Sequence, residues 1–244
     1  MNIAAKTHVG YKRMVNEDSV YISSRSIPCM AVVADGMGGH NAGEVASGIA
    51  VACLQRQLGT KTPEQITPEQ VREALQQTND YVMQKALSVE KLSQMGTTVT
   101  MAIITKDHLL LGQVGDSCGL LIQKGKLLKI TKDHSYVQEL VDKGSITQEQ
   151  AKYHPYKNVI TSCIGMAEPQ IDTYELPFCS EDILLLCSDG LTNMVEEEEI
   201  LQICEQHPEN MEKLAQGLVE CALSHGGTDN ITVVAACNRQ EVQP

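Results

Sequence analysis

The chain has 244 residues, is 42% hydrophobic and carries a formal net charge of −12. Its size suits one large domain or two small ones with a sizeable core, and its charge disfavours binding to nucleic acid or anionic membranes while favouring cationic partners, metal ions included. The nine cysteines include no C-x-x-C pair, and their odd number cannot form a complete disulfide framework, so we expect reduced core thiols in a cytoplasmic protein.

The predicted elements alternate between strands and helices along the chain. Apolar runs bounded by turn residues predict strands over 19–23, 29–34, 98–105, 109–114, 118–123, 126–130, 171–175, 183–187 and 231–236. Helical periodicity predicts helices over 42–57, 68–88, 135–143, 196–206 and 209–224. The short turns between several strands indicate antiparallel meanders.

Asp35 stands between the second strand and the first helix. Asp-Gly after a hydrophobic strand is most often a tight hairpin turn, but a helical pattern follows here, in which Val45, Ile49 and Cys53 recur at a spacing of four. We therefore expect Asp35 at a strand-to-helix corner, where glycines allow close approach of backbone or ligand. The next helix opens with Thr-Pro-Glu-Gln at 67–70, which matches a capping box with proline at the first helical position.

Residues 131–165 form a polar stretch without strand periodicity. An irregular segment of this length inside a compact domain is usually functional. No linker, repeat or change of composition divides the chain, so we expect one domain over residues 1–244. The N-terminal residues show no signal peptide, and no apolar run approaches the roughly 20 residues of a membrane span.

Four aspartates stand at the ends of hydrophobic strands, namely Asp35, Asp116 and Asp189, each beside Gly or Ser, and Asp229, which precedes the last strand. Any one of them alone is most often a turn former. Strands of one sheet system can bring their ends to one rim, where clustered carboxylates would repel unless a cation neutralised them. Oxygen ligands of this kind suit Mg²⁺ or Mn²⁺ rather than Zn²⁺.

The N-terminal stretch GYKRMVNEDSV adds Arg13, Glu17 and Asp18. Alone, it reads equally well as a solvated polar loop. Beside metal-binding carboxylates, however, the Arg13 guanidinium points to an anionic substrate, because its fork matches phosphate oxygens in a bidentate way. Metal ions together with arginine indicate a phosphate substrate.

Five motifs occur in order: G-x-x-R-x-x-N-E-D-S at 10–19, D-G-M-G-G-H at 35–40, G-D-S at 115–117, S-D-G-L-T at 188–192 and G-G-T-D-N-I-T at 226–232. This set resembles the bacterial PPM-type (protein phosphatase 2C-like) metal-dependent protein serine/threonine phosphatases. The resemblance covers residues 10 to about 234, and residues 131–165 look like the flap of that family. It implies an α/β (α+β) fold, a four-layer α-β-β-α sandwich of two antiparallel sheets flanked by helices.

The same resemblance assigns roles to the acidic residues. Asp35 would bridge two metal ions, with the Gly36 carbonyl helping the second. Asp189 and Asp229 would hold the first metal ion. Asp116 would help bind a third, weaker metal beside the flap.

The remaining motif residues would act around this centre. Glu17 and Asp18 resemble an acidic pair that acts near the second metal, largely through water. Asn230 would be a neighbour of the metal ligands. Arg13 would orient the phosphate and offset charge in the transition state.

The implied reaction is hydrolysis of phosphoserine and phosphothreonine monoesters by direct attack of water activated by two Mn²⁺ or Mg²⁺ ions. The implied partners are phosphorylated proteins, including a bacterial Ser/Thr kinase and its substrates, and the protein is expected to be a monomer. Neither nucleic acid nor a membrane is an expected partner. Three alternatives stay open: a pseudophosphatase, a phosphatase acting on a small anti-anti-sigma-type phosphoprotein, and a metal-binding module without phosphatase activity.

The sequence departs from the family pattern at several positions. Many eukaryotic relatives have His after Asp-Gly, where this chain has Met37, so the general acid is open between His40, a metal-bound water and no protein group. Cys118 and Gly119 stand where relatives usually have Arg and a larger residue, and Ser162 stands where relatives often have Arg. These differences are expected to affect flap packing or substrate preference.

Overall fold

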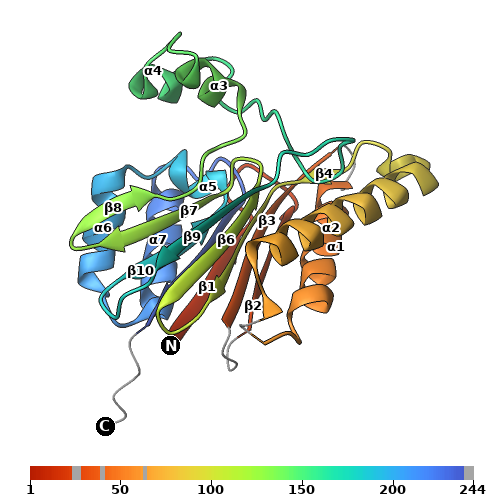
Figure 1. The fold of residues 1–244 in the computed structure, drawn as a ribbon. Coiled ribbons are helices and arrows are strands. Elements are labelled where there is room, and N and C mark those ends of the chain that lie inside the picture. The colour runs from red at the N-terminus through yellow and green to blue at the C-terminus, as the bar shows by residue number, and fades with distance from the viewer. Residues whose placement is uncertain (24–28, 39–41, 63–64, 239–244) are drawn as a thin grey trace.

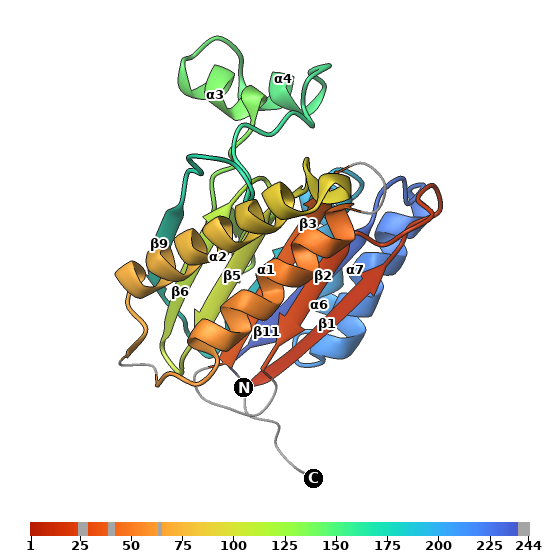
Figure 2. The same cartoon turned by 90° about the vertical axis from the view of Figure 1, so that its right-hand side faces the viewer.

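The computed structural model describes residues 1–23, 29–38, 42–62 and 65–238. Two antiparallel sheets pack face to face, and helices cover the outer face of each (Figures 1 and 2). The expected α-β-β-α sandwich is therefore confirmed. None of the helices within the described ranges is both long and apolar enough to cross a bilayer.

The first sheet contains both ends of the described chain. Its strand order is β1-β11-β10-β7-β8. The bounds are β1 Asn2–His8, β7 Cys118–Gln123, β8 Lys126–Lys129, β10 Ile183–Cys187 and β11 Ile231–Cys237. Helices α6 (Glu197–Gln206) and α7 (Met211–Ser224) pack on its outer face (Figure 1).

The second sheet has the order β2-β3-β5-β6-β9, and the short β4 pairs with β3. The bounds are β2 Asp18–Ile22, β3 Cys29–Met37, β4 Gly96–Thr97, β5 Val99–Ile104, β6 His108–Val114 and β9 Asp172–Pro177. Helices α1 (Ala42–Leu58) and α2 (Pro68–Ser88) cover it, as Figure 2 shows, and the 3-10 helix η2 (Glu90–Leu92) follows α2.

The central strands are buried on both faces, since each lies between a helix layer and the other sheet. Every residue of β5, β10 and β11 is buried. Strands in this position read as continuous apolar runs rather than as alternating patterns. The apolar side chains accordingly form three layers, one under each helix pair and one between the sheets.

Residues 131–165 leave the sandwich at the end opposite the N-terminus (Figure 1). They contain α3 (Tyr136–Asp142), which was predicted, and α4 (Gln148–Lys152), which was not. Helix α4 begins with a capping box between Thr147 and Gln150. The short helix α5 (Asp189–Thr192), directly after β10, was also not predicted.

The expected position of Asp35 at a strand-to-helix corner was wrong. Strand β3 continues to Met37, and Asp35 lies inside it, paired with Asp18 of β2. The cause is tertiary pairing, because Gly36 and Met37 extend the ladder through β4. A pattern search that ends a strand at Asp-Gly cannot detect such pairing.

Two details of the helices also differ from expectation. In α1 the expected apolar face is only partly buried, because Cys53 is buried and Ile49 packs against the core but Val45 is 37% exposed. The main buried row consists of Ala42, Ala46, Ala50 and Leu54. In α2, the Oγ1 of Thr67 accepts from the Gln70 amide at 3.3 Å, as a capping residue does. The Gln70 side chain contacts Lys61 instead of closing a capping box.

Candidate metal centre

Five aspartates from both sheets come together near the base of the flap segment. Asp35 is the common member, because its carboxylate interacts electrostatically with those of Asp18, Asp116, Asp189 and Asp229. Burial raises the pKa of Asp35 well above its ordinary value, and the neighbouring carboxylates raise it further. The aspartates selected from the sequence are thus neighbours in space.

The backbone of Asp35 is held by the chain that enters β5. Its amide donates to Thr98 Oγ1 at 3.0 Å. Its carbonyl oxygen accepts from the Thr98 amide at 2.9 Å and from Thr97 Oγ1 at 2.9 Å. Thr98 Oγ1 in turn lies 2.7 Å from Ser117 Oγ, next to Asp116. These hydrogen bonds fix Asp35 relative to the turn that carries Asp116.

Gly36 allows β3 to touch the start of α1. A Cβ at this position would overlap the carbonyl oxygen of Gly43 and lie 2.6 Å from that of Glu17. The Gly36 amide donates to the same Glu17 carbonyl at 3.1 Å. The absence of a side chain at Gly36 therefore brings Glu17 next to Asp35.

Asp18 carries an unusual unpaired oxygen. Its Oδ2 accepts from Ser188 Oγ at 2.8 Å, whereas its Oδ1 is buried and has no hydrogen-bond partner. Burial raises its pKa to about 6, although the hydrogen bond from Ser188 opposes the shift. A buried acceptor without a partner costs about 1–3 kcal/mol, and a cation ligated at Oδ1 would remove that cost.

Asp189 is the first residue of α5. Its Oδ2 accepts from Asn193 Nδ2 at 2.9 Å, which sets the orientation of the carboxylate. Burial and then the charge of Asp229 raise its pKa to about 6, and contact with Asp35 opposes this. Two carboxylates so placed favour a bound cation or a shared proton.

Arg13 lies at the open side of the centre, where its side chain is 49% exposed. Its Nη2 donates to Asp229 Oδ2 at 2.9 Å, and its Nη1 lies 4.0 Å from Glu17 Oε2. Burial raises the pKa of Glu17, an effect that Arg13 opposes. These distances place Arg13 beside the acidic cluster.

Asn230 fastens the N-terminal loop to the start of β11. Its Oδ1 accepts from the Glu17 amide at 2.8 Å, and its Nδ2 donates to the carbonyls of Val9 and Val15 at 2.9 and 3.0 Å. The side chain is buried, so all three bonds are shielded from water. Asn230 thereby positions the loop that carries Arg13.

Asp116 lies in the turn between β6 and β7. Burial, followed by the charges of Asp189 and Asp133, raises its pKa to about 7. The preceding Gly115 has a φ of +105° and exchanges two hydrogen bonds with His134, at 2.9 and 3.1 Å. The turn is therefore attached to the base of the flap segment.

Asp133 is a neighbour of the centre that sequence reasoning missed. Its Oδ2 accepts from Lys129 Nζ at 2.6 Å, and its Oδ1 is buried without a hydrogen-bond partner. Asp133 raises the pKa of Asp116, so the two carboxylates are close. Asp133 could have been noticed from the sequence, because it lies in the Lys-Asp-His run at the start of the segment 131–165.

The departures from the family pattern lie mainly in packing positions. Cys118 is buried, with its Sγ 3.5 Å from that of Cys187. A Cβ at Gly119 would lie 2.6 Å from Leu111 Cδ2. Ser162 Oγ accepts from the Gln170 amide at 2.8 Å. His40 lies outside the described residues.

The donor set fits hard divalent cations, because it consists of carboxylate and carbonyl oxygens and contains the unpaired Asp18 Oδ1. The ligand atoms of the aspartates do not lie as close together as those of a second group in the described ranges. In that group, Glu199, Cys221 and His225 each place one ligand atom within 4.8 Å of the others. The aspartates stand farther apart, and Asp229 is paired with Arg13. Binding of a cation would therefore require inward rotation of these side chains.

Known proteins resemble this chain over nearly its whole length. The chain matches the family model described as protein phosphatase 2C over residues 7–225. The serine/threonine phosphatase stp of Listeria welshimeri is 40% identical over 241 residues, which cover 96% of this chain and 94% of that protein. The serine/threonine protein phosphatase PstP of Mycobacterium tuberculosis is 40% identical over 238 residues, which cover 97% of this chain but 45% of that protein.

Solved structures show the same likeness. The M. tuberculosis phosphatase PstP/Ppp has a TM-score of 0.87 and 37% identity, with 97% of both chains covered. The catalytic domain of PstP in complex with 2 manganese ions has a TM-score of 0.84 and 36% identity, again with 97% of both chains covered. Stp1 from Staphylococcus aureus has a TM-score of 0.89 and 30% identity over 98% of this chain and 95% of that chain.

Proposed function

Because this chain belongs to the protein phosphatase 2C family, we propose that the carboxylates around Asp35 are its active site. The chain is a metal-dependent protein serine/threonine phosphatase that uses Mn²⁺ or Mg²⁺ to hydrolyse phosphomonoesters. The observation that best supports the site is the buried Asp18 Oδ1, which lacks a hydrogen-bond partner among like-charged neighbours.

In this proposal, five groups hold two cations. Asp35 would contribute to both, Asp189 and Asp229 would hold the first, and the Gly36 carbonyl and Asp18 would hold the second. Glu17 would act near the second cation through water. When bound, the cations would lower the pKa of the attacking water and neutralise charge on the phosphoryl oxygens.

The chain's own residues orient this reaction. Ser188 holds one oxygen of Asp18, and Asn193 holds one oxygen of Asp189, so each carboxylate keeps its remaining oxygen for ligation. Arg13 would release Asp229 and donate two hydrogen bonds to oxygens of the substrate phosphate. These donors would lie where negative charge develops on the phosphoryl group in the transition state. Direct attack by water requires no nucleophilic side chain.

A third, weaker cation is proposed at Asp116. The support is the second unpaired oxygen in this region, Asp133 Oδ1, together with the raised pKa of Asp116. A site that offers few carboxylates holds a hard cation only loosely. Occupancy there would respond to the metal concentration.

We further propose that residues 1–244 form one catalytic domain, with 131–165 as a flap over the site. In this segment, Lys157 Nζ donates to Asn193 Oδ1 at 3.5 Å, and the charge of Lys157 lowers the pKa of Asp189. Lys152 Nζ forms an ion pair with Glu196 Oε2 at 3.3 Å. The flap therefore contacts the segment that follows Asp189, where a phosphoprotein would bind.

Phosphoproteins made by a Ser/Thr kinase are the proposed substrates, with the protein acting as a monomer in the cytoplasm. A phosphatase of this kind opposes the kinase by removing the phosphate that it adds. The nine unpaired cysteines support the location, since reduced thiols are typical of the cytoplasm.

The test is phosphate release from a phosphothreonine peptide, measured with Mn²⁺ and with excess chelator. We expect activity only with the metal, and its loss in Asp35→Asn but not in Asp80→Asn, a matched change of an exposed carboxylate on α2. A folded wild-type protein that binds Mn²⁺ without turnover would instead support the pseudophosphatase alternative. Full activity in chelator would contradict the metal-dependent site.

A further inference from the structure

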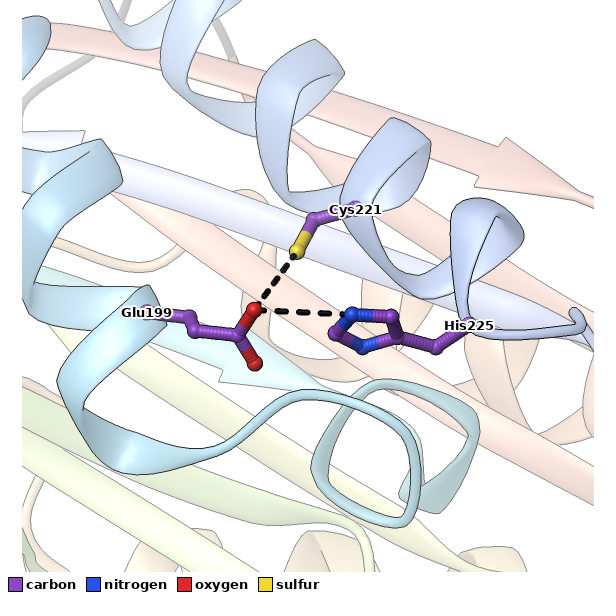
Figure 3. Close-up of side chains that lie close together, drawn as sticks. All are labelled: Glu199, Cys221 and His225. Carbon is purple, nitrogen blue, oxygen red and sulfur yellow. Dashed lines mark hydrogen bonds and ion pairs between the residues drawn. The ribbon is translucent and has the colours of Figure 1, made fainter.

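A second group of metal-ligand side chains lies outside the aspartate centre. Glu199 projects from α6 toward Cys221 and His225, which come from the C-terminal end of α7 (Figure 3). One ligand atom from each of the three lies within 4.8 Å of the others. Glu199 and Cys221 are half-buried, and His225 is exposed, so the group is accessible from solvent.

The two helices place these side chains by regular geometry. Cys221 and His225 are four residues apart, and the His225 amide donates to the Cys221 carbonyl at 3.2 Å, so both side chains lie on one helical face. Glu199 uses Oε2 to accept from the Glu196 amide at 3.2 Å. Its Oε1 is thereby directed toward Cys221 and His225, at 4.0 and 3.5 Å.

The hydrogen bonds of His225 define which nitrogen faces Glu199. His225 Nδ1 lies 2.7 Å from the Met194 carbonyl, which can only accept, so Nδ1 carries a hydrogen. In the neutral ring, Nε2 then presents a lone pair toward Glu199 Oε1, an arrangement that requires either a proton or a cation between them. A backbone carbonyl that holds one nitrogen while the other ligates is typical of metal-binding histidines.

The spacing and chemistry of the donors favour zinc. With bonds of about 2.0 Å to nitrogen and oxygen and about 2.3 Å to sulfur, a tetrahedral Zn²⁺ places its ligand atoms about 3.3–3.5 Å apart. The observed separations of 3.5 and 4.0 Å approach these values, so small side-chain rotations suffice. Thiolate and imidazole favour Zn²⁺ over Mg²⁺ and Mn²⁺.

We propose that Glu199, Cys221 and His225 form a second cation site, which binds Zn²⁺ or a similar borderline-soft ion with water as the fourth ligand. The site is connected to the two segments that carry Asp189 and Asp229 of the aspartate centre. Met194 follows the helix that begins at Asp189, and His225 precedes the loop that leads to Asp229. A bound ion would fasten α6 to α7 and restrain both loops.

Cobalt provides a direct test, because a thiolate ligand to Co²⁺ produces a charge-transfer absorption that oxygen ligands do not. Mn²⁺-loaded protein is titrated with Co²⁺ while this absorption is recorded. We expect a saturable signal in the wild type and in Cys179→Ser, which removes an exposed thiol elsewhere. The signal should vanish in Cys221→Ser, and His225→Ala should weaken binding by more than the roughly 10–100-fold that loss of an outer-shell partner costs, because it removes a direct ligand.

Thiol protection tests the wild-type chain without any substitution. Zn²⁺ should slow alkylation of Cys221 relative to Cys179, as measured by peptide mass spectrometry. Burial and the charge of Glu199 raise the pKa of Cys221, so binding should release a proton and strengthen as pH rises. Absence of a cobalt–thiolate signal, its persistence in Cys221→Ser, or an alkylation rate of Cys221 that Zn²⁺ leaves unchanged would overturn the site and leave an ordinary ion pair between Glu199 and His225.

Discussion

Asp189 shows how one side chain serves both stability and chemistry. Burial, followed by the charge of Asp229, raises the pKa of its carboxyl group to about 6, so the ionised group opposes folding unless a cation or proton neutralises it. We expect Asp189→Asn and Asp229→Asn each to lower kcat by several orders of magnitude. The melting temperature in chelator should stay constant or rise, because repulsion is relieved.

Asp182 provides the contrasting control for that experiment. It is buried, but its Oδ2 accepts from the Cys179 amide at 2.9 Å and from Gln123 at 3.0 Å, which is a structural role. Asp182→Asn should lower the melting temperature and leave kcat per folded molecule nearly unchanged. Near-normal rates in Asp189→Asn would mean that the wrong carboxylates have been assigned to the metal.

Arg13 is expected to act on substrate binding. Its guanidinium spans Asp229 and Glu17 at the open side of the centre, so Arg13→Ala should mainly raise KM for phosphorylated substrates, with a smaller fall in kcat. Arg13→Lys keeps the charge without the fork and should give an intermediate KM. Steady-state kinetics on a phosphopeptide decide the point, and an unchanged KM would return Arg13 to the role of a solvated loop residue.

At the scale of elements, the β6–β7 turn contacts the flap through Gly115 and His134. Substitution of Asp116 therefore tests whether this turn binds a third metal ion or only connects the two strands. We expect Asp116→Ala to retain the two tight metals and the melting temperature, to lower turnover strongly, and to raise the Mn²⁺ concentration that residual activity needs. Gly115→Ala should instead lower the melting temperature and leave the Mn²⁺ requirement unchanged. The φ of Gly115 is +105°, which disfavours any other residue, and a Cβ there would lie 2.6 Å from Thr98. A destabilised but fully active Asp116→Ala protein would refute the third-metal role.

The elements themselves were largely predictable from the sequence. The range of α2 was predicted correctly because proline and threonine mark its start. Strands β7 and β10 were predicted correctly as continuous apolar runs. The edge strand β1 was missed because it is only partly buried and its pattern is weak.

The sequence motifs indicate which residues are candidates for the site, but they do not indicate which of these residues contact one another. The motif order selected Asp35, Asp189 and Asp229 as candidate ligands, but the extension of β3 through Gly36 depends on pairing with β4, which lies about sixty residues away in the chain. Glu199 and His225 meet because α6 packs beside α7. Only the i,i+4 spacing of Cys221 and His225 could have been noticed beforehand.

At the scale of the whole molecule, the sandwich holds carboxylates together against their mutual repulsion. The pKa values of Asp18 and Asp189 rise from 3.8 to about 6, and that of Asp116 rises to about 7. Groups with a raised pKa stabilise the fold below the unfolded value, and this stability is lost as pH rises through the folded value. In chelator, the melting temperature should therefore fall from pH 5 to pH 8.

Calorimetry at these two pH values checks this expectation. Saturating Mn²⁺ should restore the melting temperature at pH 8, because the cation replaces the lost protons and binds only the folded state. Asp189→Asn in chelator should show a smaller fall than the wild type. A melting temperature that stays flat or rises with pH in chelator would mean that burial and neighbouring charge do not raise the pKa values of these carboxyl groups.

The most direct test of the central assignment is the number of Mn²⁺ ions bound tightly per chain, measured by titration calorimetry and elemental analysis in wild type and Asp35→Asn. The wild type should bind about two ions tightly. Asp35→Asn should remain folded and lose tight binding of both, because the bridging carboxylate is shared. An Asp35→Asn protein that keeps the wild-type number and affinity of Mn²⁺ ions would contradict the assignment.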